Sequence, residues 1–201
     1  MNGTRLPGPE RREQLLRVAR AVLAERGFHE TSMNDIASAA GVTKPVLYQH
    51  FASKRELYTA VLTDVGQRLE ATVIDTAAGG TTPRSQVEAG FAAYVDFVEE
   101  DPDGFSLLFS GSSRQDPEWG AVTNSVEFSI ATGIASLIAV EGMSQHHRLA
   151  LAHGIIGLAE SMMRFWQREV GVLNRDDLLR DLVALAWVGL RGLEPAPSPS
   201  S

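Results

Sequence analysis

The stretch TSMNDIASAAGVTKPVLYQHFASKRELYTAVL, residues 31–62, decides the fold that the sequence predicts. Gly41 divides its first part into two short segments, and hydroxyl side chains stand where helices would begin, at Ser32, Thr43 and Ser53. Serine and threonine are preferred there because their oxygens accept the unpaired N–H groups of the first turn. Apolar residues recur at helical spacing throughout. The pattern predicts helix, glycine turn and helix, followed by a longer helix.

Helical geometry divides the second short segment, residues 44–50, into two faces. The inward face is predicted to pack on the preceding helices, through Val46, Leu47 and Phe51 against Leu15, Ala19 and Ile36. The outward face carries hydrogen-bond donors and no carboxylate, namely Lys44, Tyr48, Gln49 and, at the helix end, His50. A helix-turn-helix places such a helix in the major groove of DNA, where donors suit phosphates and base edges. Singly, Tyr48 and His50 are equally consistent with ordinary half-buried side chains, but the complete pattern favours DNA binding.

The rest of the chain also predicts helices, so the fold class is all-α with about nine helices. No window shows the alternating β-branched pattern of strands. A flexible tail at 1–8 precedes a helix-turn-helix domain at 9–52 and a connecting helix at 53–76. After the linker AAGGTTP, a helical ligand-binding and dimerisation domain is predicted at 77–193, and a disordered tail at 194–201. Later helices are predicted to begin near Pro83, Pro102, Pro117, Ser144 and Asn174.

Composition excludes several classes of protein. The 201 residues include no cysteine, which excludes disulfides and thiolate metal sites, and 44% are hydrophobic, which suffices for a packed core. No apolar run approaches the roughly 18 residues of a membrane span. The N-terminal MNGTRLPGPERREQ lacks the apolar region of a secretory signal. We therefore expect a soluble, cytoplasmic protein without a membrane partner.

Charge is distributed unevenly along the chain. The formal net charge is −7, yet residues 1–58 carry nine Lys and Arg against six Asp and Glu. Residues 59–201 carry nine Lys and Arg against nineteen Asp and Glu. A mildly basic N-terminal part on an acidic body indicates that only the N-terminal part meets a polyanion.

Residues 12–62, and above all 31–62, closely resemble the DNA-binding domain of the TetR family of transcriptional regulators. The resemblance implies phosphate contacts from Tyr48, His50 and Lys54, to which Ser32 and Thr43 are added. It implies that bases are read by Asn34, Lys44 and Gln49. Many family members have a small residue where this chain has Pro45, so contacts of that turn transfer less directly.

The same resemblance implies a homodimer of about nine helices per subunit that binds an operator on double-stranded DNA. Most family members are repressors released by a small ligand, so repression is the expected mode. Activation is the alternative within the family. A more distant alternative is a helical carrier of small molecules that binds no DNA.

Large, adaptable side chains on several C-terminal helices predict an apolar ligand pocket. The candidates are Phe91, Tyr94, Val98, Phe105, Leu108, Phe109, Trp119, Val122, Val126, Met162, Met163 and Trp166. Arg114 and Arg164 are candidates for its mouth, and the competing interpretation is plain core packing. Segments 96–109, 163–168 and 185–193 resemble actinobacterial TetR-type regulators of lipid metabolism. That resemblance implies a hydrophobic effector such as long-chain acyl-CoA or a fatty acid, against the alternative of a sensor of aromatic or cationic drugs.

The last two predicted helices offer a surface for dimerisation. A stripe at helical spacing comprises Leu178, Leu182, Leu185, Ala186 and Gly189, and the preceding helix has a side with small residues, His153, Gly154, Ile156, Gly157 and Glu160. Small residues let helices approach closely across a two-fold axis. Burial within the subunit is the competing explanation, and each helix is expected to have one face of each kind.

An enzyme is not predicted, and neither a cofactor nor a metal site is. Ser106 and Ser113 lack the spacing of a nucleophile elbow, and no glycine-rich loop follows a strand. The adjacent histidines His146 and His147 point to different sides of a helix, which favours a solvated helix start. The acidic run from Glu99 to Asp103 is similarly expected to be a solvated helix end.

Overall fold

The computed structural model describes residues 7–169 and 171–192. The predicted tail at 194–201, and residues 1–6 of the N-terminal tail, lie outside these ranges. Every element in the described residues is helical, as the sequence predicts. Within the same residues, no helix is long and apolar enough to cross a membrane.

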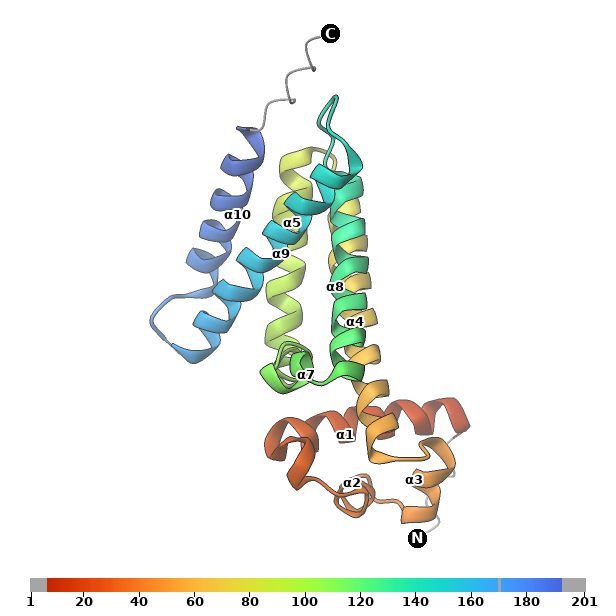
Figure 1. Ribbon diagram of the computed structural model, residues 1–201. Coiled ribbons are helices and arrows are strands. Elements are labelled where there is room, and N and C mark those ends of the chain that lie inside the picture. The colour runs from red at the N-terminus through yellow and green to blue at the C-terminus, as the bar shows by residue number, and fades with distance from the viewer. Residues whose placement is uncertain (1–6, 170, 193–201) are drawn as a thin grey trace. The chain divides into compact units, whose positions relative to one another are not determined.

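The helices follow the predicted order (Figure 1). Their bounds are α1 Gly8–Glu30, α2 Met33–Ala39, α3 Lys44–His50, α4 Lys54–Ala78, α5 Pro83–Glu100, α6 Pro102–Leu108, α7 Gly111–Gln115, α8 Pro117–Leu137, α9 Gln145–Arg168 and α10 Arg175–Arg191. The short helix α7 is an addition to the nine expected from the sequence. Its sequence, GSSRQ, contains no apolar side chain whose spacing could signal a helix.

The predicted capping residues begin their helices. Prolines occupy the first residue of α5, α6 and α8, where their missing N–H costs no hydrogen bond. Ser144 and Asn174 accept hydrogen bonds from the backbone N–H groups of His147 and Asp177, at the starts of α9 and α10. The starts of these five helices are therefore determined by local sequence.

Two glycines with positive φ shape the N-terminal helices. Gly41 has φ +64° in the turn between α2 and α3, a left-handed conformation that glycine adopts without strain. Gly27 has φ +77° and interrupts the helical backbone of α1, which continues for one further turn to Glu30. The predicted stop at Gly27 is thus a kink. We call Gly27–Thr31, the segment from the kink to the start of α2, the corner.

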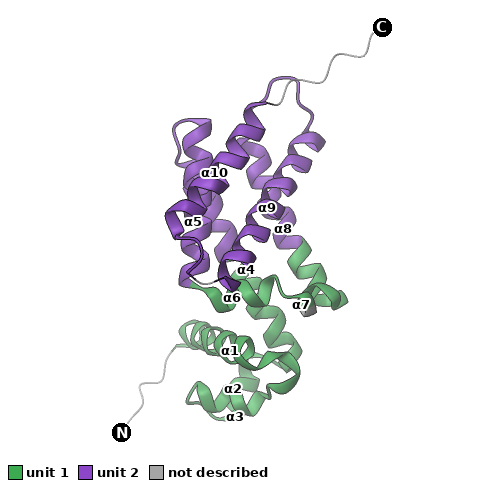
Figure 2. Ribbon diagram, turned by 90° about the vertical axis from the view of Figure 1, so that its left-hand side faces the viewer, with its two compact units in different colours: residues 1–67, 101–124 green, residues 68–100, 125–201 purple. Residues whose placement is uncertain are grey.

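The chain packs into two compact units (Figure 2). Unit 1 comprises residues 1–67 and 101–124, and unit 2 comprises residues 68–100 and 125–201. Helices α4 and α8 each contribute residues to both units. The boundaries of these compact units differ from the domain boundaries predicted near residues 52 and 76. The predicted domains were defined by function, and they remain predictions.

Unit 1 has its core between α1, α2 and α3, as predicted. The fully buried side chains there are Leu15, Ala19, Leu23, Ile36, Leu47 and Phe51. Helix α6 packs on α1. At its start, Asp101 is 6% exposed, accepts a hydrogen bond from the Gly104 N–H and pairs with Arg20 at 2.6 Å. The expectation of a solvated acidic run is wrong at Asp101, because its carboxylate is both a helix cap and an ion-pair partner.

Unit 2 packs α10 against α5 and α9. Arg175 at the start of α10 forms ion pairs with Asp96 and Glu99 of α5. The stripe predicted on α10 divides into two sets, because Leu178, Leu182 and Ala186 are buried inside the unit whereas Leu185 and Gly189 are exposed. Leu182 is therefore a core residue, and its predicted place on a dimer surface is corrected.

Candidate nucleic-acid interface

The outward side of α2 and α3 carries the side chains that the sequence predicted to contact DNA. Buried Leu47 fixes the orientation of α3, and Tyr48 is 43% exposed. We call the exposed set on these two helices the reading face: Asn34, Thr43, Lys44, Tyr48 and Gln49. None of the five is a carboxylate, and each has a polar group that can donate a hydrogen bond.

Thr43 occupies the predicted N-cap position of α3, but its hydroxyl makes no capping hydrogen bond. The backbone carbonyl of Thr43 instead begins the helix by accepting from Val46 and Leu47 N–H. Pro45 stands in the first turn, where it has no N–H to satisfy. The Thr43 hydroxyl is consequently available to a partner from outside.

Ser32 is engaged differently, although it was predicted to contact phosphate. Its hydroxyl accepts from Asp35 N–H, and the Ser32 backbone N–H donates to the Asp35 carboxylate at 2.8 Å, which completes a capping box. The hydroxyl also donates to the same carboxylate at 2.6 Å. The hydrogen bonds from Ser32 lower the pKa of Asp35 below its ordinary value. Ser32 therefore fixes the first turn of α2, and the same turn carries the exposed Asn34.

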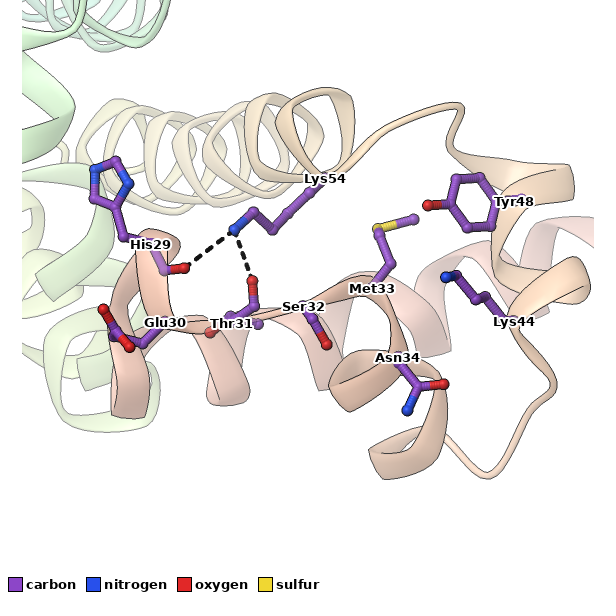
Figure 3. A pocket seen from close by; sticks show the side chains of 9 residues that line it. All are labelled: His29, Glu30, Thr31, Ser32, Met33, Asn34, Lys44, Tyr48 and Lys54. Carbon is purple, nitrogen blue, oxygen red and sulfur yellow. Dashed lines mark hydrogen bonds between the residues drawn. The ribbon is translucent and has the colours of Figure 1, made fainter.

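An open hollow of about 560 Å³ lies beside these residues (Figure 3). Its lining is His29, Glu30, Thr31, Ser32, Met33, Asn34, Lys44, Tyr48 and Lys54. In Figure 3, Lys44 and Tyr48 approach it from α3, whereas His29 and Glu30 come from the end of α1. The structure thus brings together five of the nine predicted DNA-binding residues around one concave surface.

Lys54, at the start of α4, is turned toward the protein. Its ammonium donates hydrogen bonds to the carbonyl oxygens of Phe28 and Thr31, each at 2.6 Å, and a longer one of 3.5 Å to that of His29. Figure 3 draws the bonds to His29 and Thr31. It also lies 4.2 Å from the centre of the Phe28 ring. The phosphate contact expected of Lys54 stays a prediction, in competition with these partners.

His50 and Arg12 meet where α3 ends. The Arg12 guanidinium donates to the His50 carbonyl at 3.2 Å and stacks 4.4 Å over the Phe51 ring. The half-buried His50 side chain stays a predicted phosphate ligand. No local pattern indicates Arg12 as a partner of α3, because 38 residues separate it from the carbonyl that it binds.

A second cluster joins the start of α4 to the start of α8 within unit 1. Arg55 forms ion pairs with Asp116, at 2.5 Å, and with Glu118, and it lies over the Trp119 ring. The hydrogen bond from Arg55 lowers the pKa of Glu118. Desolvation opposes the shift at Asp116, but hydrogen bonds from Arg55 and two backbone N–H groups lower its pKa as well. These carboxylates are neutralised within the protein.

The predicted ligand-pocket residues divide between the two units. Phe105, Leu108, Phe109, Trp119 and Val122 belong to unit 1, and Phe91, Tyr94, Val98, Val126, Met162, Met163 and Trp166 to unit 2. Trp119 packs edge-on against Phe28 and also against Tyr58. Of the two predicted mouth residues, Arg164 pairs with the buried Glu160, and Arg114 lies over the Phe109 ring.

No group of three His, Cys, Asp or Glu side chains able to hold a metal comes together among the described residues. His146 and His147 are both exposed in the first turn of α9, which is the solvated helix start that the sequence predicts.

Comparison with known proteins gives a consistent result. The family model for bacterial regulatory proteins of the tetR family matches residues 15–61. The HTH-type transcriptional activator FasR of Mycolicibacterium smegmatis is 35% identical over 189 residues, which cover 94% of this chain and 86% of FasR. The HTH-type transcriptional repressor KstR2 of Mycobacterium tuberculosis is 36% identical over 89 residues, 44% of each chain.

Comparison of the fold with solved structures points to the same family. A crystal structure of a TetR-like transcriptional regulator from Rhodococcus sp. RHA1 superposes with a TM-score of 0.72 at 31% identity, covering 94% of this chain and 100% of that one. These relatives are transcriptional regulators and not enzymes, in agreement with the sequence-based prediction. With a helix-turn-helix and a relative similar over nearly its whole length, this chain belongs to the TetR family of DNA-binding transcriptional regulators.

Proposed function

We propose that the protein binds a pseudo-palindromic operator as a two-fold dimer and responds to a hydrophobic small molecule. In each half-site, α3 enters the major groove. Asn34, Lys44 and Gln49 read base edges, while Thr43, Tyr48 and His50 bind phosphates. The observation that carries the proposal is the reading face, where five exposed donor groups without a carboxylate lie on a helix pair held by a buried core.

Salt-dependent binding tests the DNA-binding part of the proposal. Fluorescence anisotropy with a labelled operator, identified by footprinting genomic fragments, gives affinity as a function of salt. The logarithm of affinity is expected to fall linearly with that of salt, because phosphate contacts release counterions. A mixed-sequence duplex is the control and is expected to bind about 10³-fold or more weakly. A carrier of small molecules without DNA binding would show no binding to either duplex.

The proposed dimer surface is an exposed strip on α9 and α10. We call Gly154, Gly157, Phe165, Leu185 and Val188 the outer strip. Leu185 is 57% and Val188 69% exposed, and a Cβ added at either glycine would meet nothing within 4 Å. Large exposed apolar side chains beside small residues suit a close contact between two copies. Binding of such a dimer to both half-sites requires its two recognition helices to stand about 34 Å apart, one turn of DNA.

The proposed effector site lies in unit 2, where α5 packs against α9. Phe91 and Tyr94 of α5 and Met163 of α9 are buried, and methionine adapts readily to irregular apolar ligands. We infer a long acyl chain as the ligand class. Oleoyl-CoA, oleic acid and a cationic aromatic dye are to be titrated against the operator complex. The acyl compounds are expected to change DNA affinity by 1–3 kcal/mol of coupling, and the operator to change acyl binding equally. Failure of all three would refute the sensing proposal.

The sign of regulation has two candidates. Repression is the first, since KstR2, similar in its N-terminal part, is named a repressor. Activation is the second, favoured by similarity to the activator FasR over nearly the whole chain. Transcription in vitro with purified RNA polymerase and the footprinted promoter decides between them. Lower transcript yield with the protein supports repression, and higher yield supports activation.

A further inference from the structure

We infer that Arg12 of α1 is a further DNA-binding residue: its guanidinium binds a backbone phosphate at the end of α3, beside His50. This inference rests on the proposed operator binding and extends the site to α1. Arg12 precedes residues 15–61, the segment that matches the family model, and it is not among the DNA-binding residues predicted from the sequence.

Two contacts hold the Arg12 side chain against the end of α3. Its Nη1 donates a hydrogen bond to the His50 carbonyl oxygen at 3.2 Å, and its Cζ lies 4.4 Å from the centre of the Phe51 ring. The second distance is within the range of a cation–π contact. Phe51 is fully buried, so its ring is a fixed surface for the guanidinium. The charge is therefore in place before DNA binds, which reduces the entropy that binding costs.

The Arg12 guanidinium keeps most of its capacity to donate. It has five N–H donors, and the His50 carbonyl takes one of them, which leaves four. The side chain is exposed. Arg20 and Arg55 of the same unit are paired with carboxylates, whereas Arg12 has no ion-pair partner in the described part of the chain. A planar guanidinium without a carboxylate partner suits bidentate binding of a phosphate.

The end of α3 is a place where a phosphate needs a cation. When the first residues of a recognition helix reach base edges, its other end lies toward the DNA backbone. The last carbonyl groups of a helix carry partial negative charge, which repels an anion. Arg12 binds the last carbonyl of α3 directly and adds a full positive charge beside it. This contact changes the end of the helix from a repulsive to an attractive site for phosphate.

Arg11 provides a matched control for the first test. It is the neighbouring arginine of α1, and its guanidinium donates to Gln14 of the same helix at 2.5 Å. Arg12→Gln and Arg11→Gln remove the same charge, and anisotropy with the operator measures the affinity of each folded variant against salt. Arg12→Gln is expected to reduce the salt slope of the dimer by about 1.8, or about 0.9 for each subunit. Arg11→Gln is expected to keep the wild-type slope.

The salt dependence separates a phosphate contact from a purely structural role. With the lower slope, the affinity that Arg12→Gln loses should be about tenfold smaller at about 0.2 M salt than at about 0.05 M. Arg12→Lys keeps the charge and should therefore keep the wild-type slope. If Arg12→Gln weakens binding by the same factor at every salt concentration, Arg12 only holds α3 and the inference is overturned. An equal loss of slope in Arg11→Gln would overturn it too.

A measurement on the wild-type protein covers the case in which Arg12→Gln does not fold. Phenylglyoxal modifies exposed arginines, and tandem mass spectrometry locates the modified residues. The operator is expected to protect Arg12 from modification, while Arg84, an exposed arginine of α5 in unit 2, stays reactive. Unchanged reactivity of Arg12 in the operator complex would overturn the inference.

The two proposals can fail separately. If the wild-type protein binds no duplex at any salt concentration, the proposed function fails, and the role of Arg12 fails with it. If the wild-type protein binds the operator with a linear salt dependence and Arg12→Gln has the same slope, only the role of Arg12 fails.

Discussion

The reading face and the outer strip are both exposed, yet they differ in kind. The reading face, on α2 and α3, presents hydroxyl, amide and ammonium groups. The outer strip, on α9 and α10, presents Phe165, Leu185 and Val188 beside two glycines. The first surface suits a partner that carries phosphates and base edges, and the second suits an apolar partner of the same shape. The difference matches the proposed assignment of the first surface to DNA and of the second to a second copy of the chain.

The largest effect is expected from placing charges on the outer strip. The double variant Leu185→Glu/Val188→Glu should yield a folded monomer, because carboxylates would be buried at the two-fold contact. Operator affinity should fall by about 10²–10⁴-fold, because the two helix-turn-helix domains would no longer be linked in one dimer. Light scattering measures the mass, and anisotropy measures the affinity.

Thr72→Glu/Thr76→Glu is the control for this double variant. It adds the same charge at two exposed positions of α4 that also belong to unit 2. It should remain dimeric and bind the operator within a few-fold of the wild type. If both double variants stay dimeric, the outer strip is not the dimer interface, and its exposed apolar side chains need another explanation.

A pair of leucine truncations on α10 tests which side of this helix belongs to the core. Leu182→Ala is expected to lower the free energy of unfolding by about 2–5 kcal/mol, because Leu182 is fully buried. Leu185→Ala is expected to leave the unfolding of an isolated subunit nearly unchanged. Urea titration at low protein concentration measures both. Equal losses for the two variants would place Leu185 in the core as well.

The reading face should separate residues that read bases from those that bind phosphates. Gln49→Ala is expected to lose about 1–3 kcal/mol of preference for operator over mixed-sequence duplex. Tyr48→Phe, the comparison variant, removes one hydroxyl and should weaken binding to both duplexes alike. Competition anisotropy yields the two affinities. An unaltered preference in Gln49→Ala would remove this residue from the base-reading set.

The smallest effect concerns acid, and it bears on the carboxylates that unit 1 pairs within the protein. The pKa values of Asp116 and Glu118 lie below their ordinary 3.8 and 4.5, so their contribution to stability is complete above about pH 5 and is lost as pH falls through the lowered values. Arg55→Gln should therefore lower the unfolding midpoint slightly at pH 7, and the difference from wild type should shrink as pH falls through the lowered pKa values of Asp116 and Glu118. A difference that persists in acid would mean that Arg55 acts through packing on Trp119.

The exposed polar side of α2 and α3 could be predicted from the sequence because its determinants are local. The Ser32–Asp35 capping box and the left-handed Gly41 act within a few residues, so their pattern is visible along the chain. Sequence reasoning placed Asp101 wrongly in solvent and Leu182 wrongly on an interface. In each case the deciding partner is distant, since Arg20 lies 81 residues before Asp101 and α10 packs on α5.

The sequence by itself determined the nine longer or capped helices, most of their starts, the glycine turn and the donor-rich side of α3, because these depend on hydrogen bonds and side-chain periodicity within one or two turns. Tertiary structure alone decided which face of α10 is buried and which cation meets which partner. Lys54 and Lys44 each begin a helix, and nothing in their local sequence distinguishes an ammonium bound to carbonyl groups of α1 from one that is exposed. That distinction arises only when packing brings the end of α1 against the start of α4.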